Sequence, residues 1–320
     1  MKFRLFGIIF IGVALALLLL FIVQLISFAG RTPLSAITNS DSSAQTETKP
    51  NNVDTGLTPV FFRTISEYGS GNSKKLRING TSEPDTVLTL LNENTRMRQF
   101  KSDETGNWEI DIEIDPVQSL ALEIIMFAEN GVSVRGDEII YRLPVPKKPE
   151  EVGVQTTALI MVCAPGGPSR IVQSPFGGSP TQGPLSMGPI DYDDSGGIIL
   201  SGTTASEGRV RIYAGGEAFG ETRVGAGGRW NFIAGNLLPR GEYPISAELI
   251  GADGIQARVS VPFELLPPSQ DETKTASDLP EVKYEPFRWQ VRRVLLGGGH
   301  QTTTIFAPIE AKALIVGTEE

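Results

Sequence analysis

Hydrophobic and polar residues alternate along much of the chain between positions 58 and 267. After Trp108, isoleucines alternate with acidic residues over positions 109–114, and the same alternation runs through residues 243–249 and 257–263. A period of two predicts strands with one buried and one solvated face, which is the pattern of antiparallel sheets.

The chain also repeats itself. Residues 76–81 align with residues 198–203, which lie 122 positions later, and the match continues with one residue gained to the end of the alternating region. In each copy an Asn-Gly or Asp-Gly pair lies between two alternating runs, which favours a type I′ hairpin turn because both residues of that turn have positive φ. The matched landmarks are Gly80, Gly106, Trp108 and Asn130-Gly131 in the first copy, and Gly202, Gly228, Trp230 and Asp253-Gly254 in the second.

Each copy holds about six or seven short strands and no helical periodicity, which predicts a β-sandwich. The expected fold class is therefore all-β. Two tandem sandwiches are expected at residues 58–146 and 156–267, the second with an extended lead-in.

The first thirty residues follow a different pattern. Lys2 and Arg4 precede an apolar run over residues 5–30, in which Gln24 is the single strongly polar side chain. About 25 residues at ~1.5 Å rise each can cross a ~30 Å hydrocarbon core. A cleaved signal peptide is the alternative, because Ser27 and Ala29 are small residues at plausible cleavage positions. The apolar region of a signal peptide, however, usually spans only about 7–15 residues. The sequence therefore favours an uncleaved transmembrane helix.

The charges beside this helix predict its orientation. Basic residues precede it and only Arg31 follows it, which places the N-terminus in the cytoplasm. In a bacterium the protein would then be a single-pass inner-membrane protein with residues 31–320 in the periplasm. Residues 31–57 are polar without periodicity and are expected to be a flexible linker.

Composition narrows the function classes. The chain has one cysteine, one histidine and a formal net charge of −9. The single Cys163 excludes an internal disulfide and any CxxC site, and the single His300 excludes histidine-pair metal sites and leaves one candidate for a Ser-His-Asp triad. The acidic balance without a basic stripe argues against a nucleic-acid partner. No carboxylate spacing singles out an acid/base pair, so neither an enzyme nor a cofactor is expected.

Several side chains have both a functional and a structural interpretation. Trp108 and Trp230 could stack on sugars, but their equivalent repeat positions favour the core. The aspartates at 191, 193 and 194 could begin a Ca²⁺ loop, but the twelfth position is Gly202 instead of glutamate, which favours a polar turn. Glycines 297–299 could hold a phosphate, but they lack the strand–helix context. Cys163 lies in an apolar run and is expected to be buried and inert.

The repeat carries a family resemblance. The Gly-Thr-Ser-Glu-Pro segment at 80–84, followed by Asp-x-x-Gly-x-Trp at 103–108, resembles the bacterial Ig-like repeat. The second copy has Ser206 and Gly225 where that pattern has proline and aspartate. Segments 158–165, 169–174 and 191–197 are similar to bacterial envelope proteins with an N-terminal membrane segment, Ig-like domains and a C-terminal LysM peptidoglycan-binding module.

The C-terminal segment leaves two interpretations open. An acidic linker at 268–284 precedes residues 285–320, which follow the order of a LysM helix, glycine-rich turn and second helix. The usual Gly-Asp-Ser/Thr-Leu turn before the first helix and the strand after the second are missing. The segment is therefore either a degenerate or truncated LysM, or a frayed tail or short strand pair on the second sandwich. Under the LysM interpretation, the peptidoglycan-binding residues would be Trp289, Arg292, Gly297 and Thr303.

These observations predict a non-enzymatic, membrane-anchored envelope protein whose Ig-like domains act as a spacer and interaction surface outside the inner membrane. The alternative is a peptidoglycan-binding protein that acts through its C-terminal segment. The expected partners are the membrane and either peptidoglycan or another envelope protein. Deletion of the C-terminal segment is expected to leave both sandwiches folded.

Overall fold

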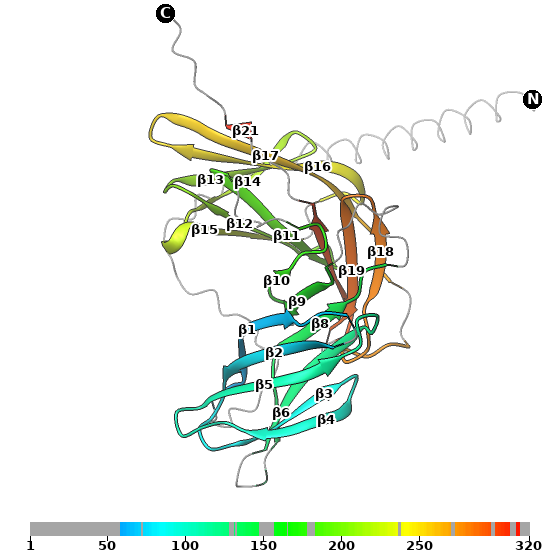
Figure 1. Ribbon diagram of the computed structural model, residues 1–320. Helices are drawn as coiled ribbons and strands as arrows, with labels where there is room; N and C mark the ends of the chain where they lie inside the picture. The colour runs from blue at the N-terminus through cyan, green and yellow to red at the C-terminus, as the bar shows by residue number, and fades with distance from the viewer. Residues whose placement is uncertain are drawn as a thin grey trace, which may run out of the picture. The chain divides into compact units, whose positions relative to one another are not determined.

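The computed structural model describes most of the chain beyond position 57 (Figure 1). The expected membrane anchor at 1–30 and linker at 31–57 lie outside the described residues. None of the helices in the described part has the length and apolar character that a membrane crossing needs. The described residues are 58–71, 73–127, 131, 133–146, 157–164, 166–177, 183–235, 238–269, 273–295, 298–307 and 312–313.

The first sandwich is built from consecutive strands. One sheet has the order β1-β2-β5, and the facing sheet contains β4-β3-β6-β8, with β7 paired to β6. Three strands facing four in this antiparallel order are typical of Ig-like sandwiches. The strands are β1 (Phe61–Tyr68), β2 (Lys74–Thr81), β3 (Val87–Asn92), β4 (Thr95–Lys101), β5 (Asn107–Ile114), β6 (Leu120–Phe127), β7 (Ser133–Arg135) and β8 (Ile139–Leu143).

The second sandwich repeats this order. Strands β15, β12 and β11 form one sheet, and β14, β13, β16 and β17 form the other. Val87 and Arg209 open β3 and β13, and Asn107 and Arg229 open β5 and β15, so the repeat seen in the sequence is also a structural repeat. The strands are β11 (Leu185–Asp193), β12 (Ile198–Thr204), β13 (Arg209–Ala214), β14 (Glu217–Arg223), β15 (Arg229–Ala234), β16 (Gly241–Gly251) and β17 (Gly254–Leu265), with a short 3₁₀ turn, η2 (Ala226–Gly228), before β15.

A glycine beneath a tryptophan recurs in both copies. A Cβ added at Gly80 would lie 2.4 Å from Trp108 Cζ2, and one at Gly202 would lie 2.6 Å from Trp230 Cζ2. The indole therefore rests on a strand that has no side chain at that point. Trp108 and Trp230 are only 4% and 3% exposed, which confirms the predicted core role.

Two further strands extend the first sandwich. β9 (Leu159–Cys163) pairs with β8, and β10 (Arg170–Gln173) pairs with β9. The sequence prediction assigned these residues to the second domain, whereas the structure places them in the sheet of the first. β9 is buried on both faces, so its apolar run lacks the alternation that would have shown which sheet it joins.

The C-terminal segment forms strands, and the predicted LysM helices are not present in its described residues. β18 (Glu281–Glu285), β19 (Arg288–Val294) and β20 (His300–Phe306) form an antiparallel meander, and β20 pairs with β11. The short strand pair on the second sandwich, one of the two interpretations from the sequence, is therefore the one observed. β-branched residues over 302–305 favour a strand there. β21 (Lys312–Ala313) pairs with β17.

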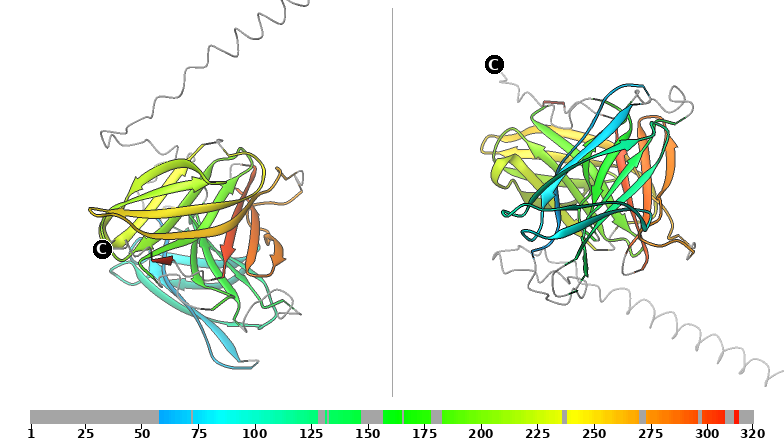
Figure 2. Two further views of the ribbon diagram at one scale, coloured as in Figure 1. Left: turned by 90° about the horizontal axis from the view of Figure 1, so that it is seen from above. Right: turned by 60° about the horizontal axis from the view of Figure 1, so that its bottom comes forward.

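Figure 2 gives two further views of the strands. In the described part of the chain, three hydrophobic cores lie between the four sheets. The first core lies inside the first sandwich and the second inside the second sandwich. The third, here called the junction core, joins the other face of the β8–β9 sheet to the face of β19 and β20. Its buried members are Ala121, Ile139, Tyr141, Leu143, Leu159, Met161, Cys163, Phe176, Trp289, Val291 and Ile305.

Candidate functional site

The junction core is centred on Trp289, whose side chain is fully buried. Its ring meets Phe176 edge-on at 5.8 Å between centroids and Tyr284 at 4.7 Å. Tyr141 Oη donates a hydrogen bond of 3.3 Å to the carbonyl of Ala276, in the segment before β18. Aromatic pairs of this kind stabilise packing by ~0.5–1.5 kcal/mol beyond the buried area. The junction is therefore packed like a protein interior.

A buried polar cluster lies beside this core, here called the junction cluster: Ser169, Asp191, Arg293, Gln301 and Thr303. Asp191 accepts hydrogen bonds from Ser169 N at 2.7 Å, from Ser169 Oγ at 2.6 Å and from Thr303 Oγ1 at 2.6 Å. Arg293 donates to Thr303 Oγ1 at 2.9 Å and to Gln301 Oε1 at 2.8 Å. The aspartate and the arginine are thus connected through shared hydroxyl groups.

The junction cluster links segments that are far apart in the sequence. Ser169 belongs to the β9–β10 connection of the first sandwich, whereas Asp191, Arg293 and Thr303 belong to β11, β19 and β20. Gln301 Nε2 also donates to the carbonyl of Gly167 at 2.9 Å. Buried charges are tolerated only with good hydrogen-bond geometry. The junction cluster can therefore form only when the two sandwiches are in this relative orientation.

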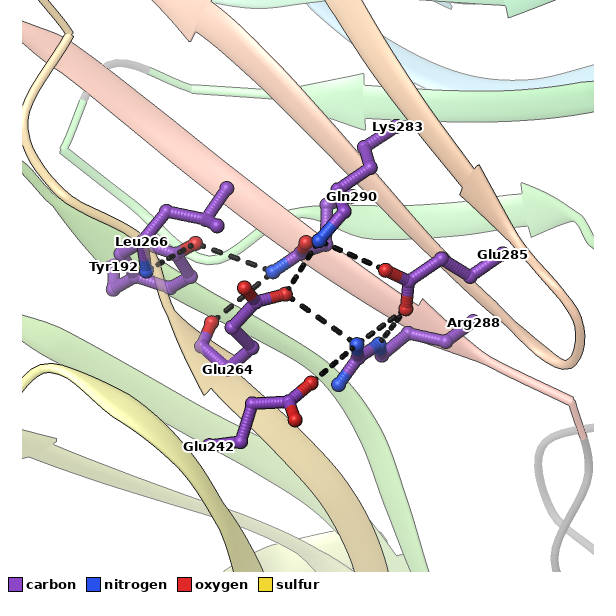
Figure 3. Close-up of polar contacts among 8 residues, drawn as sticks. All are labelled: Tyr192, Glu242, Glu264, Leu266, Lys283, Glu285, Arg288 and Gln290. Carbon is purple, nitrogen blue, oxygen red and sulfur yellow. Dashed lines mark hydrogen bonds and ion pairs between the residues drawn. The ribbon is translucent and has the colours of Figure 1, made fainter.

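A second polar cluster ties the β18–β19 hairpin to the far sheet of the second sandwich (Figure 3). Arg288 of β19 meets Glu285 of β18, Glu242 of β16 at 3.2 Å and Glu264 of β17 at 3.4 Å. Lys283 bridges Glu264 and Glu285, each at 2.8 Å. Burial alone would raise the pKa of Glu285, but the hydrogen bonds from Lys283 and Arg288 lower that pKa below its usual value. We call this group the hairpin-base cluster.

Of the four predicted peptidoglycan-binding residues, the structure describes Trp289, Arg292 and Thr303. Trp289 and Thr303 are fully buried, the first in the junction core and the second in the junction cluster, so neither presents a face to a sugar. Arg292 donates to Thr302 Oγ1 at 3.2 Å and to the carbonyl of Pro267 at 2.8 Å. Gly297 lies outside the described residues. Peptidoglycan binding by the segment as a whole stays a prediction.

The other candidates have structural roles. Asp191 lies in the junction cluster, Asp193 accepts from Gly197 N at 2.9 Å within its own turn, and Asp194 Oδ2 lies 3.0 Å from His300 Nδ1, so the three carboxylates serve different contacts. Among the described residues, no group of histidine, cysteine and acidic side chains could hold a metal ion. Cys163 is buried, as predicted, and burial raises the pKa of its thiol.

An open recess of about 380 Å³ lies between the two sandwiches and the segment before β18. Its two cations already have partners: Arg135 meets the buried Glu123 at 3.1 Å, and Lys274 meets Glu281 at 3.1 Å. The recess therefore offers no free charge for a substrate. Its lining residues are Asn94, Arg135, Lys274, Thr275, Ala276, Ser277, Val294 and Leu295.

Comparison with known proteins gives little. No protein-family model matches the chain, and no curated protein matches it. Among solved structures, the central fibronectin-III array of RIM-binding protein is 10% identical, with a TM-score of 0.23, and the match covers 78% of this chain and 89% of that one. The fibronectin(III)-like modules of Clostridium thermocellum CbhA are 13% identical, with a TM-score of 0.19, and the match covers 64% of this chain and 93% of that one. Both TM-scores are below 0.5, so the Ig-like description rests on the strand order.

Proposed function

We propose that the chain is a non-catalytic spacer in which two Ig-like sandwiches form one rigid unit that presents interaction surfaces. The junction core is the observation that supports this proposal. Tandem domains with small, polar contacts move relative to one another by default, whereas a large apolar interface restrains them. Here Trp289, Tyr141 and Phe176 are buried between the sandwiches, and the junction cluster adds directional hydrogen bonds.

The side-chain chemistry supports a structural role. Buried charged groups of the described part have partners inside the fold: Asp191 bonds to the hydroxyls of Ser169 and Thr303, Arg142 pairs with Glu67 at 2.9 Å, and Glu123 pairs with Arg135 at 3.1 Å. Catalysis needs a reactive group that can reach a substrate in a cleft. These groups are held by partners inside the fold, which suits a scaffold.

A distance measurement tests rigidity. Spin labels on cysteines placed at the exposed Glu104 in the first sandwich and Glu217 in the second, with Cys163 replaced by alanine, should give one narrow distance distribution. Trp289→Ala should broaden it, because the cavity loosens the junction. A distribution that is equally broad with Trp289 present contradicts a rigid spacer.

We further propose that residues 1–30 anchor this spacer in the bacterial inner membrane, with the sandwiches in the periplasm. The support is the length and apolar character of that segment and the basic residues that precede it. The full chain should then fractionate with membranes and resist carbonate extraction. A soluble form that begins near Gly30 contradicts the anchor.

A further inference from the structure

An exposed aromatic side chain occupies the tip of the β18–β19 hairpin. Glu285 pairs with Arg288, so Pro286 and Phe287 form a two-residue turn. Pro286 suits the first turn position, and the second then requires positive φ, where glycine or asparagine is usual. Phe287 stands there with φ of 65° and is 65% exposed. A bulky, strained and solvent-exposed residue is unfavourable for the isolated chain, which points to a contact that the structure does not contain.

β18 beside this tip is a sheet edge. It pairs with β19, and no strand among the described residues pairs with its other side. The pair that flanks a two-residue turn is hydrogen-bonded, and pairs alternate along an antiparallel ladder. The backbone groups of Tyr284 and Val282 therefore point to the open edge, where an added strand could bond to them.

The two faces of β18 differ in chemistry. Val282 packs against the junction core, and Tyr284, which is 39% exposed, stacks edge-on against Trp289, so this face is apolar up to the edge. The other face carries Glu281, Lys283 and Glu285. At the hairpin base, three acids meet two bases, and the side chain of Glu242 is 71% exposed. These residues are Glu242, Glu264 and Glu285 against Lys283 and Arg288, whereas Glu281 is balanced by Lys274 and by Arg292, its partner on β19.

The ion pairs at the hairpin base hold this edge in place. Arg288 has a nearly buried guanidinium that contacts acids from β16, β17 and β18 (Figure 3). A strand that docks on β18 would therefore meet an ordered edge, which lowers the ordering cost of binding.

We propose that the open edge of β18 binds an extended segment of a partner protein as an additional strand, with apolar side chains over Val282 and Tyr284 and basic side chains toward Glu285 and Glu242. Main-chain hydrogen bonds supply affinity in this mode, and alternate side chains supply specificity. Phe287 covers the end of the docked segment. An anionic lipid surface is disfavoured because the hairpin-base cluster carries an excess of acid. The inference rests on the interaction role proposed above.

The test uses the full chain in detergent and a displayed library of short random peptides. Peptides selected on the natural chain should alternate apolar and basic residues, and a synthetic consensus peptide is then titrated. Val282→Pro removes the backbone N–H that points to the open edge, but no hydrogen bond between β18 and β19. It should therefore weaken peptide binding about tenfold or more. Val282→Ala, which loses side-chain packing but keeps the donor, should bind within about twofold of the natural chain.

Phe287→Gly supplies the second variant, because it relieves the strained turn and should leave the chain at least as stable while weakening the peptide about threefold or more. Val117→Ala, an exposed apolar residue in a turn of the first sandwich, is the matched control and should change nothing. Failure to select peptides that distinguish the natural chain from Val282→Pro overturns the proposal. So does binding of anionic vesicles or purified peptidoglycan that is lost on Phe287→Gly while peptide binding is absent. The spin-label distances report on the rigid spacer independently of either result.

Discussion

The two sandwiches share a repeat but are extended at different edges. The first adds β9 and β10 to β8, its last strand, whereas the second adds β20, β19 and β18 to β11, its first strand. These two extended sheets are the ones that meet across the junction core. The repeated strands thus make two similar sandwiches, and the strands outside the repeat join them into one unit.

The copies also differ where the two sheets of each sandwich approach each other. In the first, Arg98 of β4 donates a hydrogen bond of 2.6 Å to the carbonyl of Asp111 in β5. The equivalent positions in the second are Gly220 and Ile233. A Cβ at Gly220 would lie 2.3 Å from the ring of Phe232, so an aromatic ring fills the space that the arginine uses in the first copy. The two copies thus share a backbone arrangement, while different side chains fill the space between their sheets at this edge.

Removal of residues 281–320 should have the largest effect on this comparison. The second sandwich would lose the strand beside β11, and the junction core would lose Trp289, Val291 and Ile305. Three buried side chains of this size contribute roughly 5 kcal/mol or more. Calorimetry should show the transition of the second sandwich lost or moved far down, with the first sandwich less affected. Unchanged transitions would mean that the segment is the dispensable tail expected from the sequence.

Asp191→Ala should be next in size. It leaves Arg293 buried without its hydroxyl-bridged carboxylate, and breaking one side of a buried charged network usually destabilises by ~3–5 kcal/mol. Denaturant unfolding measures the loss. Asp193→Ala, a neighbouring aspartate whose contacts are within its own turn, is the control and should lose far less. Adding Arg293→Met to Asp191→Ala should recover part of the loss; no recovery would show that the charge is not the cause.

Gly80→Ala and Gly202→Ala test whether the two copies are equivalent where they match. In each, the added methyl group would collide with a backbone carbonyl of the neighbouring strand, Phe61 O at 2.0 Å or Ser186 O at 2.1 Å, and with the tryptophan, and overpacking of this kind costs about 1–3 kcal/mol or more. The two losses should be similar, each in the transition of its own sandwich. Gly235→Ala, where nothing lies within 4 Å of the added Cβ, should be close to neutral. Very unequal losses would contradict a shared geometry.

Asp103→Asn should have the smallest effect and should separate the copies by pH. Hydrogen bonds from the Thr105 side chain and backbone and from the Asn107 backbone lower the pKa of Asp103, whereas the second copy has Gly225 at this position. Because this pKa is lower in the folded state, the ionised Asp103 stabilises the fold at pH values above its ordinary pKa of 3.8. That stabilisation is lost as the pH falls through the pKa of the folded state. The first sandwich should therefore lose stability in acid through this group, and Asp103→Asn should remove that part of its pH dependence. If the Asp103→Asn variant loses as much stability in acid as the natural chain, another group causes the pH dependence.

The candidate residues show where sequence reasoning succeeds. Trp108 and Trp230 were predicted to be buried because they occupy the same repeat position before an alternating strand, and both are. Trp289 had no repeat partner, so its order within the segment suggested a helix and a sugar platform, whereas it is the centre of the junction core. The alternation in β19 was available, but both of its faces are largely buried, which hides the period of two.

Residues and spacing alone determined the two repeated sandwiches and the core positions of their matched tryptophans, because a strand with one buried face has a period of two in its sequence. That a glycine lies beneath each tryptophan became visible only in the structure. The tertiary structure decided which sheet 159–173 and 281–306 would join. Strand pairing at an edge is made by backbone groups that are the same for every residue, and a strand buried on both faces carries no alternation to reveal its neighbours. The contact between the sandwiches was for that reason invisible until the fold brought Ser169, Asp191 and Thr303 together.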